Sequence, residues 1–397
     1  MSEQKYTECP ECNGYLNKCG KNDQGYQRYI CKQCGKKFSV NTLDSIFEFN
    51  TKYMLLLKEN ARLKKNFERL QFFQDQALEM IKNEIYKLPK ICPAKEIKVK
   101  YKYKEENAVL LFSDLQLGSL VDKTETSGLA KYDKNEFRKR IDKLTSSIYE
   151  VVKIQRNGGI PLNKLKIHVL GDIVQGEAVF PGQAFKLDTL MLGQIFGLGD
   201  EVIDRLIVPM AKLFTEIEIF CVPGNHGMQG KRGQHPRASN WDYIVYHLWQ
   251  RRLANTEHIK FYISASPFLI YEMFPGQLHA LIHGQQARGW LGYPYYGVDR
   301  MHKSLISLTG MYLQYLYHGH HHQPSMQDTH IGKKIGNGSL EGGSDYSVND
   351  LLTANTPQQF FFGINEKGMT WEYWLRLAEY PKLMPDENGI LTKLMVV

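Results

Sequence analysis

The sequence predicts an α/β protein, preceded by a small cysteine-rich unit and a long helix. Three observations support this prediction. Short apolar runs alternate with segments of helical pattern over the last three quarters of the chain. Two Cys-x-x-Cys pairs lie near the amino terminus, and leucine then recurs every seven residues. At 397 residues the chain is long enough for two or three such units.

Five apolar runs are typical of buried strands, and glycine or proline follows each run closely. These runs cover residues 108–112, 166–170, 217–222, 278–282 and 315–317. We expect helices at about 133–155, 187–214, 239–254 and 299–312. Catalytic groups usually lie in loops held by a rigid sheet. The polar residues that follow the five strands are therefore expected to form a site.

These polar residues make up five short motifs. In chain order they are Ser113-Asp114-Leu115-Gln116-Leu117-Gly118, Gly171-Asp172, Gly224-Asn225-His226, His283-Gly284 and Gly319-His320-His321-His322. A mixture of carboxylate, imidazole and amide suits Mn²⁺, Fe or Zn²⁺ better than Ca²⁺. Each motif alone is explained as a turn, a helix cap or a surface histidine tract. The five together favour a metal centre.

In this order the motifs resemble those of the calcineurin-like metallophosphoesterases, over about residues 106–375. The resemblance implies a four-layer sandwich of two mixed β-sheets flanked by helices. It also implies hydrolysis of phosphate esters with two divalent cations, Mn²⁺ being favoured over Fe or Zn²⁺. The implied ligands are Asp114, Gln116 and His322 for the first cation, Asn225, His283 and His320 for the second, and Asp172 as the bridge. His226 is implied to act on the substrate.

Two positions depart from the family's usual pattern. Gln116 stands where histidine is usual, and an amide oxygen is a weaker ligand than imidazole. Gln175 stands where aspartate or histidine usually orients the catalytic histidine. It can hydrogen-bond His226 but cannot stabilise an imidazolium by its charge. Both changes predict weaker metal binding or a lower rate, and because Asp172 is retained we still expect activity.

The four cysteines Cys9, Cys12, Cys31 and Cys34 have the spacing of a structural zinc site. The alternative is disulfides or unpaired thiols. No amino-terminal signal sequence is recognisable, so we expect a cytoplasmic location, where disulfides are rare. Residues 27–38 resemble the second half of the zinc ribbons found on transposases and other DNA-binding proteins. The candidate DNA contacts in this segment are Arg28, Lys32, Lys36 and Lys37. Binding to a protein is the alternative.

A short coiled-coil pattern follows within residues 41–92. Its two seams are Leu56, Leu63, Leu70 and Ala77, and Asn60, Phe67, Gln74 and Ile81. The pattern predicts a homodimer through residues 52–84. The alternative is an amphipathic helix that packs on its own catalytic domain.

Positive charge is concentrated on this helix and on the segment that follows it. Residues 51–104 hold 14 Lys and Arg against 6 Asp and Glu, an excess that equals the net charge of +8 of the whole chain. Such a basic stripe favours binding to a phosphate backbone, and a solvated helix face is the alternative. Lys231, Arg232 and Arg237 are further candidate phosphate contacts. No apolar run approaches the length of a membrane span.

The sequence therefore predicts a zinc ribbon at 1–40, a basic helical linker at 41–92 and a metallophosphoesterase domain at 93–397. Its predicted function is a two-metal DNA exo- or endonuclease, distantly resembling the SbcD-like repair nucleases and phage-type enzymes. RNA is left open as a ligand, and a protein partner in a repair or replication complex is allowed for. One alternative is a catalytically weakened nucleic-acid-binding subunit. The other is a protein phosphatase or a small cyclic-nucleotide phosphodiesterase.

Overall fold

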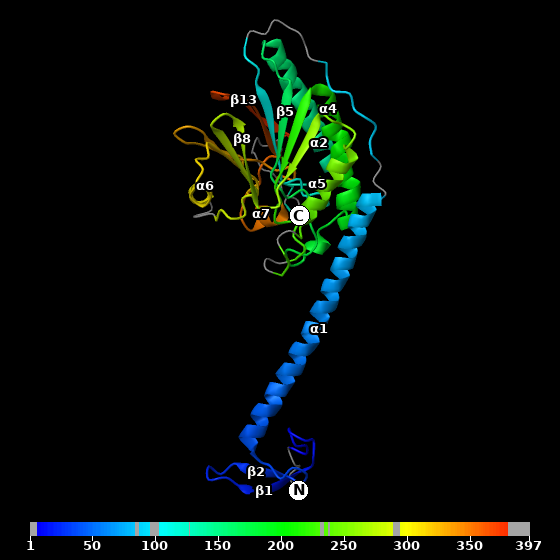
Figure 1. The fold of residues 1–397 in the computed structure, drawn as a ribbon, viewed down its shortest axis with the longest axis vertical. Helices are drawn as coiled ribbons and strands as arrows, with labels where there is room; N and C mark the ends of the chain where they lie inside the picture. The colour runs from blue at the N-terminus through cyan, green and yellow to red at the C-terminus, as the bar shows by residue number, and fades with distance from the viewer. Residues whose placement is uncertain are drawn as a thin grey trace, which may run out of the picture. The chain divides into compact units, whose positions relative to one another are not determined.

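The structure is a computed structural model that describes residues 6–83, 87–95, 103–126, 128–230, 234–236, 239–288 and 294–379. It divides into two compact units, Met1–Asn83 and Glu84–Val397, which are described separately (Figure 1).

The larger unit contains two mixed β-sheets, which confirms the predicted fold class. The six-stranded sheet has the order β14-β13-β4-β5-β6-β7 and the five-stranded sheet the order β11-β12-β10-β9-β8. The first consists of β4 (Asn107–Phe112), β5 (Lys164–Val169), β6 (Glu216–Cys221), β7 (Ile259–Ile263), β13 (Gln358–Asn365) and β14 (Gly368–Arg376). The second consists of β8 (Phe268–Phe274), β9 (Gln277–Ile282), β10 (Tyr315–His318), β11 (Ser325–Asp328) and β12 (Lys333–Gly336).

All five predicted strands are confirmed, as β4, β5, β6, β9 and β10. Their apolar runs are continuous because both faces of the strands are covered, as in β4, where every residue is buried. Neighbours β4, β5 and β6 run parallel, and so do β9 and β10. The carboxyl ends of each parallel set therefore meet at one edge of their sheet.

Helices cover the outer faces of both sheets. The sheets pack through a core that includes Val109, Phe362 and Tyr317. On the outer side of the five-stranded sheet, Met301 of α6 packs near Leu316 of β10. Figure 1 shows α2, α4 and α5 beside the six-stranded sheet and α6 beside β8 on the opposite side, so four layers are present.

The predicted helices are confirmed as α2 (Lys134–Asn157), α5 (Trp241–Arg252), α6 (Tyr295–Thr309) and one composite helix. The composite helix consists of η2 (Gly193–Leu198), α3 (Gly199–Val202), η3 (Ile203–Ile207) and α4 (Val208–Leu213). It begins later than predicted because the preceding segment is held elsewhere, by the hydrogen bond from Asp188 N–H to the Gly118 carbonyl. Two short helices, η1 (Gln183–Phe185) and α7 (Asp345–Asn349), complete the unit.

The smaller unit is a three-stranded antiparallel sheet followed directly by a long helix. Its elements are β1 (Leu16–Lys21), β2 (Gln27–Cys31), β3 (Lys37–Ser39) and α1 (Val40–Asn83). Leu43 of α1 is buried with Tyr29 and Phe38 of the sheet, so the first turns of the helix belong to the ribbon core.

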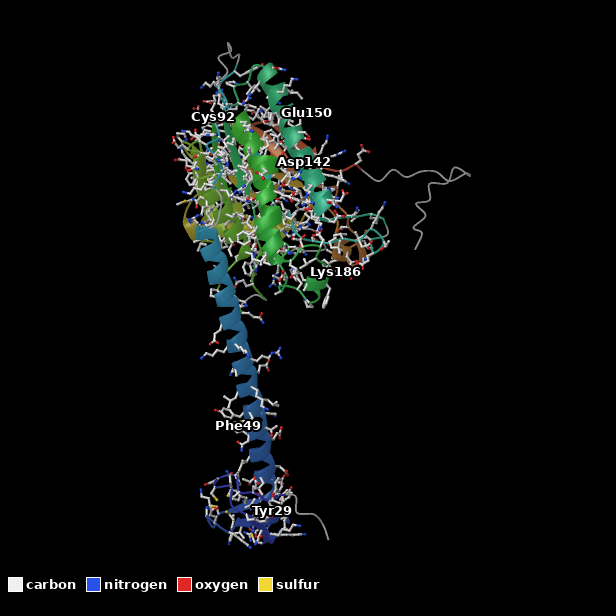
Figure 2. The ribbon with its side chains drawn as sticks, turned by 90° about the vertical axis from the view of Figure 1, so that its right-hand side faces the viewer. Tyr29, Phe49, Cys92, Asp142, Glu150 and Lys186 are labelled. Carbon is white, nitrogen blue, oxygen red and sulfur yellow. The ribbon has the colours of Figure 1, made fainter. Side chains whose placement is uncertain are left out.

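Beyond these turns the helix carries exposed apolar side chains. Phe49 projects from α1 (Figure 2) and is 68% exposed, and Leu56 and Asn60 of the predicted seams are exposed as well. The side chains of the other seam positions lie outside the described residues, so the homodimer stays a prediction. Of the helices in the described ranges, none has the length and apolar character to cross a bilayer.

Candidate metal centre and zinc site

The structure brings the predicted ligands of the second cation together. Nε2 of His283 lies 3.0 Å from Asp172 Oδ2 and 3.0 Å from Asn225 Oδ1. Ligand atoms of Asp172, His283 and His320 all lie within 4.8 Å of one another. Ligands about 2.1 Å from a shared ion lie roughly 3 Å apart, so this arrangement fits one cation.

The predicted ligands of the first cation lie beside the same aspartate. Nε2 of His322 is 3.4 Å from Asp114 Oδ1, and Nε2 of Gln116 is 3.3 Å from Asp172 Oδ2. Oε1 of Gln116 is buried and has no hydrogen-bond partner. Flipping the side-chain amide of Gln116 would exchange the positions of its Oε1 and Nε2 atoms. Oε1 of Gln116 would then face the same point as Oδ2 of Asp172. The donor set therefore fits a second cation, with Asp172 between the two.

Backbone strain is concentrated at these ligands. The described residues include seven non-glycine residues with positive φ, and five of them are predicted ligands. Those five are Asp114 (54°), Gln116 (49°), Asp172 (53°), His320 (72°) and His322 (54°). Each such residue costs about 1–3 kcal/mol and persists only where the surrounding fold holds it. Strain of this kind typically marks a functional site.

Two motif glycines allow the loops to approach the carboxylates. A Cβ atom on Gly224 would lie 2.1 Å from Asp172 Oδ1, and one on Gly319 would lie 2.4 Å from Asp114 Oδ2. Neither approach is compatible with a side chain. These glycines therefore contribute to the site by leaving room for the two carboxylates.

Carbonyl groups orient two of the histidines. His283 Nδ1 donates to the Leu170 carbonyl at 2.7 Å, and His226 Nδ1 donates to the Gln175 carbonyl at 3.1 Å. Each ring therefore directs Nε2 toward the site, where His226 Nε2 lies 4.0 Å from Asp172 Oδ2. The sequence suggested a contact from the Gln175 side chain. In the structure the main chain of Gln175 makes the contact, while the side-chain Oε1 is buried without a partner.

Burial and charge set the protonation of the ligands. Burial disfavours both charged groups of the Asp172–His283 pair, but their attraction raises the pKa of His283 to about 9 and lowers that of Asp172. Burial likewise opposes charge on His322, but its contact with Asp114 raises the pKa to about 9. Burial and the charge of His283 lower the pKa of His320 to about 3. A cation would therefore displace protons from His283 and His322.

Sequence analysis missed Asp242, a buried residue in the first turn of α5. Its carboxylate accepts hydrogen bonds from the N–H groups of Asp172 (3.0 Å), Ile173 (3.1 Å), Val174 (3.3 Å) and Gly224 (2.9 Å). It thus joins two of the ligand-bearing loops. Burial and the charge of Asp172 raise the pKa of Asp242 to about 6, while the N–H groups of Gly224 and Val174 act to lower it. An acid in a first helical turn is commonplace, so the sequence carried no signal.

Glu341 was also missed. Its Oε2 lies 3.8 Å from Nδ1 of His322, and its Oε1 accepts from Ser119 Oγ at 2.5 Å. A carboxylate behind a ligating histidine orients the ring and strengthens it as a ligand. Glu341 lies outside the five motifs that follow the predicted strands. Its contact with His322 is therefore visible only in the folded chain.

The four amino-terminal cysteines form a compact cluster. Cys9 and Cys34 have sulfurs 3.7 Å apart, and those of Cys12 and Cys31 are 3.5 Å apart. All four lie within 4.8 Å of one another. A tetrahedral site with Zn–S bonds of about 2.3 Å requires sulfurs roughly 3.8 Å apart, whereas a disulfide requires about 2.05 Å. The N–H of Cys34 lowers the pKa of the Cys31 thiol to about 6, which favours its thiolate, whereas the pKa values of Cys12 and Cys34 are raised by burial and by the Cys31 thiol. The cluster therefore fits one structural Zn²⁺.

The two halves of this cluster share one hydrogen-bond pattern. In each half, the N–H of the first cysteine donates to the carbonyl of the residue five positions later in the chain. The carbonyl of the same cysteine accepts from the N–H of the residue four positions later. The residues concerned are Cys9, Asn13 and Gly14 in the first half, and Cys31, Gly35 and Lys36 in the second. Each half is therefore a local turn that presents two sulfurs.

The basic candidates of the ribbon differ in their surroundings. The register of β2 and β3 places Arg28 and Lys37 on the same face of the sheet. Lys32 is exposed, while Lys36 forms an ion pair with Glu11. The other three basic candidates, Lys231, Arg232 and Arg237, lie outside the described residues.

No family model matches this sequence, and no curated protein matches it either. Several solved structures are similar to part of the chain. Vps29 from Entamoeba histolytica, in complex with zinc, is 12% identical with a TM-score of 0.31, covering 68% of this chain and 92% of its own.

Two further solved structures show a comparable similarity to the chain. An archaeal phosphodiesterase is 10% identical with a TM-score of 0.28, covering 67% of this chain and 99% of its own. A predicted phosphoesterase from Streptococcus pneumoniae is 10% identical with a TM-score of 0.27, covering 68% and 99%.

Proposed function

We propose that the chain is a two-cation phosphodiesterase that acts on nucleic acid, as a DNA exo- or endonuclease. The observation that carries the proposal is the convergence of carboxylate, imidazole and amide ligands from five strand ends around Asp172. A structure that only needed stability would not hold five of these residues in strained conformations.

The ligands divide into two sets around this aspartate. Asp114, Gln116 and His322 would hold one cation, and Asn225, His283 and His320 the other. Bound there, the two cations would neutralise phosphate charge and acidify the attacking water. Mn²⁺ is the proposed ion, with Fe and Zn²⁺ as alternatives.

His226 is the proposed catalytic residue. Its Nδ1 is held by the Gln175 carbonyl, and its Nε2 faces the ligand cluster. In this orientation Nε2 can hold a proton and deliver it to the oxygen that leaves phosphorus. Since a main-chain carbonyl orients the ring, a carboxylate at position 175 is not required for this role.

Two basic regions of the chain support a nucleic acid as the substrate. Arg28 and Lys37 share one face of the ribbon sheet, and the basic excess of the chain lies in residues 51–104. Basic residues on one face are the usual means of holding a phosphate backbone. We also propose that two copies pair through residues 52–84, where Tyr53 and Leu56 are exposed.

The test is cleavage of end-labelled single- and double-stranded DNA with Mn²⁺, comparing the unmodified chain with Asp172→Asn. We expect Asp172→Asn to lower cleavage by about 1,000-fold or more, because the shared carboxylate is lost, and to leave DNA affinity unchanged. Asp142→Asn is the matched control, because Asp142 lies on the surface of α2 (Figure 2) and, among the described residues, forms its ion pair with Arg205.

A catalytically weakened nucleic-acid-binding subunit is the second candidate. It is favoured by Gln116, whose amide nitrogen faces Asp172 at a position where a cation ligand is expected. DNA binding without cleavage by either chain would support this candidate. Cleavage of small phosphodiesters without DNA binding would instead favour a protein phosphatase or cyclic-nucleotide phosphodiesterase. Normal DNA cleavage by Asp172→Asn would contradict the proposed centre.

A further inference from the structure

An exposed aromatic ring lies beside the proposed catalytic histidine. The ring centroids of Phe180 and His226 are 5.1 Å apart, at an interplanar angle of 55°. Phe180 is 48% exposed, so one part of its ring contacts His226 and another faces solvent. A phenylalanine that served only the core would be buried.

A buried amide fixes this ring relative to His226. Oε1 of Gln183 accepts from the N–H groups of Val179 (2.8 Å) and Phe180 (3.2 Å). Its Nε2 donates to the Gln175 carbonyl at 2.6 Å, and that carbonyl also accepts from His226 Nδ1. Gln183 is only 5% exposed. One side chain therefore sets the positions of both rings.

The loop that carries Phe180 is also tied to the first metal-binding motif. The carbonyl of Lys186 accepts from Leu120 N–H at 3.0 Å, and Asp188 N–H donates to the Gly118 carbonyl at 3.0 Å. At the other end of the loop, Gln175 N–H donates to the Leu117 carbonyl at 3.0 Å, so the loop is anchored at both of its ends. A ring held in place before a ligand arrives loses little conformational entropy when it stacks on that ligand.

We infer that Phe180 is the stacking surface for the nucleobase next to the phosphate that is cleaved. The inference rests on the proposed phosphodiesterase function and deepens it. Aromatic side chains bind bases through their faces without reading the sequence. Since a base can stack on a protein ring only after it leaves its neighbours, the site selects nucleotides whose bases are unstacked, at single strands and chain ends.

The test compares two chromogenic esters with Mn²⁺ present. One is the p-nitrophenyl ester of thymidine 5′-phosphate, and the other is its analogue in which hydrogen replaces the base. We expect the unmodified chain to show a kcat/KM about 10-fold higher for the ester with the base. Phe180→Leu, which keeps an apolar contact with His226 but loses the flat ring, should remove this preference. Phe180→Tyr should retain it.

Phe185→Leu is the matched control, because Phe185 lies in the same loop and is 91% exposed. It should leave the preference unchanged. If Phe180 only packed against His226, Phe180→Leu would slow both esters equally, and the inference would be overturned. Equal kcat/KM for both esters in the unmodified chain would overturn it too, while the phosphodiesterase proposal would stand. Hydrolysis of neither ester by the Mn²⁺-loaded chain would overturn both.

Discussion

The two metal-binding regions of this chain are built in opposite ways. The cysteine cluster takes its ligands from two local turns with the same hydrogen-bond pattern, within residues 9–34. The proposed catalytic centre takes its ligands from five strand ends in two sheets, between Asp114 and His322. The first site is local in the sequence, and the second exists only in the folded chain.

The two regions also differ in whether the metal ion supports the fold or the fold supports the metal site. The ribbon core has few buried residues, among them Leu16 and Tyr29, so we expect its fold to depend on a bound zinc ion. The catalytic centre instead has a large unit beneath it, which holds Asp114 and Asp172 in strained conformations. We therefore expect metal to stabilise the fold of the ribbon, and the fold of the larger unit to prepare the proposed metal site.

The largest expected effect is loss of the ribbon fold when zinc is removed. Cys31→Ser should abolish structural zinc binding, which in small zinc domains is worth about 10–16 kcal/mol. Hydrogen exchange should then show unprotected amides in β1 to β3, while the Tm of the larger unit stays the same. Cys92→Ser is the control, since Cys92 is exposed (Figure 2) and distant in sequence from the cluster. A ribbon that keeps its protection without zinc would contradict this dependence.

A smaller effect is expected where the fold holds the catalytic loops. Asp242→Asn replaces one of the two acceptor oxygens with an N–H donor. Two buried N–H groups then lose their acceptor, either those of Asp172 and Gly224 or those of Ile173 and Val174. At about 1–3 kcal/mol for each unpaired group, the free energy of unfolding should fall by about 2–5 kcal/mol. Denaturant titration measures this change. The exposed Asp204→Asn should be nearly neutral, and equal stability of the two variants would show that Asp242 does not hold the loops.

The smallest effect concerns the first cation alone. Gln116→His replaces an amide with imidazole, a better ligand for Mn²⁺ or Zn²⁺, so the cation should bind about 10-fold more tightly. Metal titration with elemental analysis measures the change, and the zinc of the ribbon serves as an internal reference in the same sample. An unchanged Kd would mean that residue 116 is not a ligand.

Some features of the candidate site could be predicted from the sequence, and others could not. The five buried runs and the motifs that follow them were recognisable because apolar character and ligand type are properties of single residues. Asp242, Gln183 and Glu341 were not recognisable. Each acts through contacts with residues distant in the sequence or through main-chain groups, and neither kind of contact leaves a local pattern.

The sequence by itself determined the kinds of ligand, their order along the chain and the cysteine spacing of the ribbon. It also determined five strands of the two sheets, β4, β5, β6, β9 and β10, because continuous apolar runs are stable only when both faces are covered. Only the tertiary structure decided that the ligands meet at Asp172, that their backbone is left-handed and that a carbonyl orients His226. The physical reason is that strain and convergence are imposed by distant packing, which stabilises local conformations that the residues themselves disfavour.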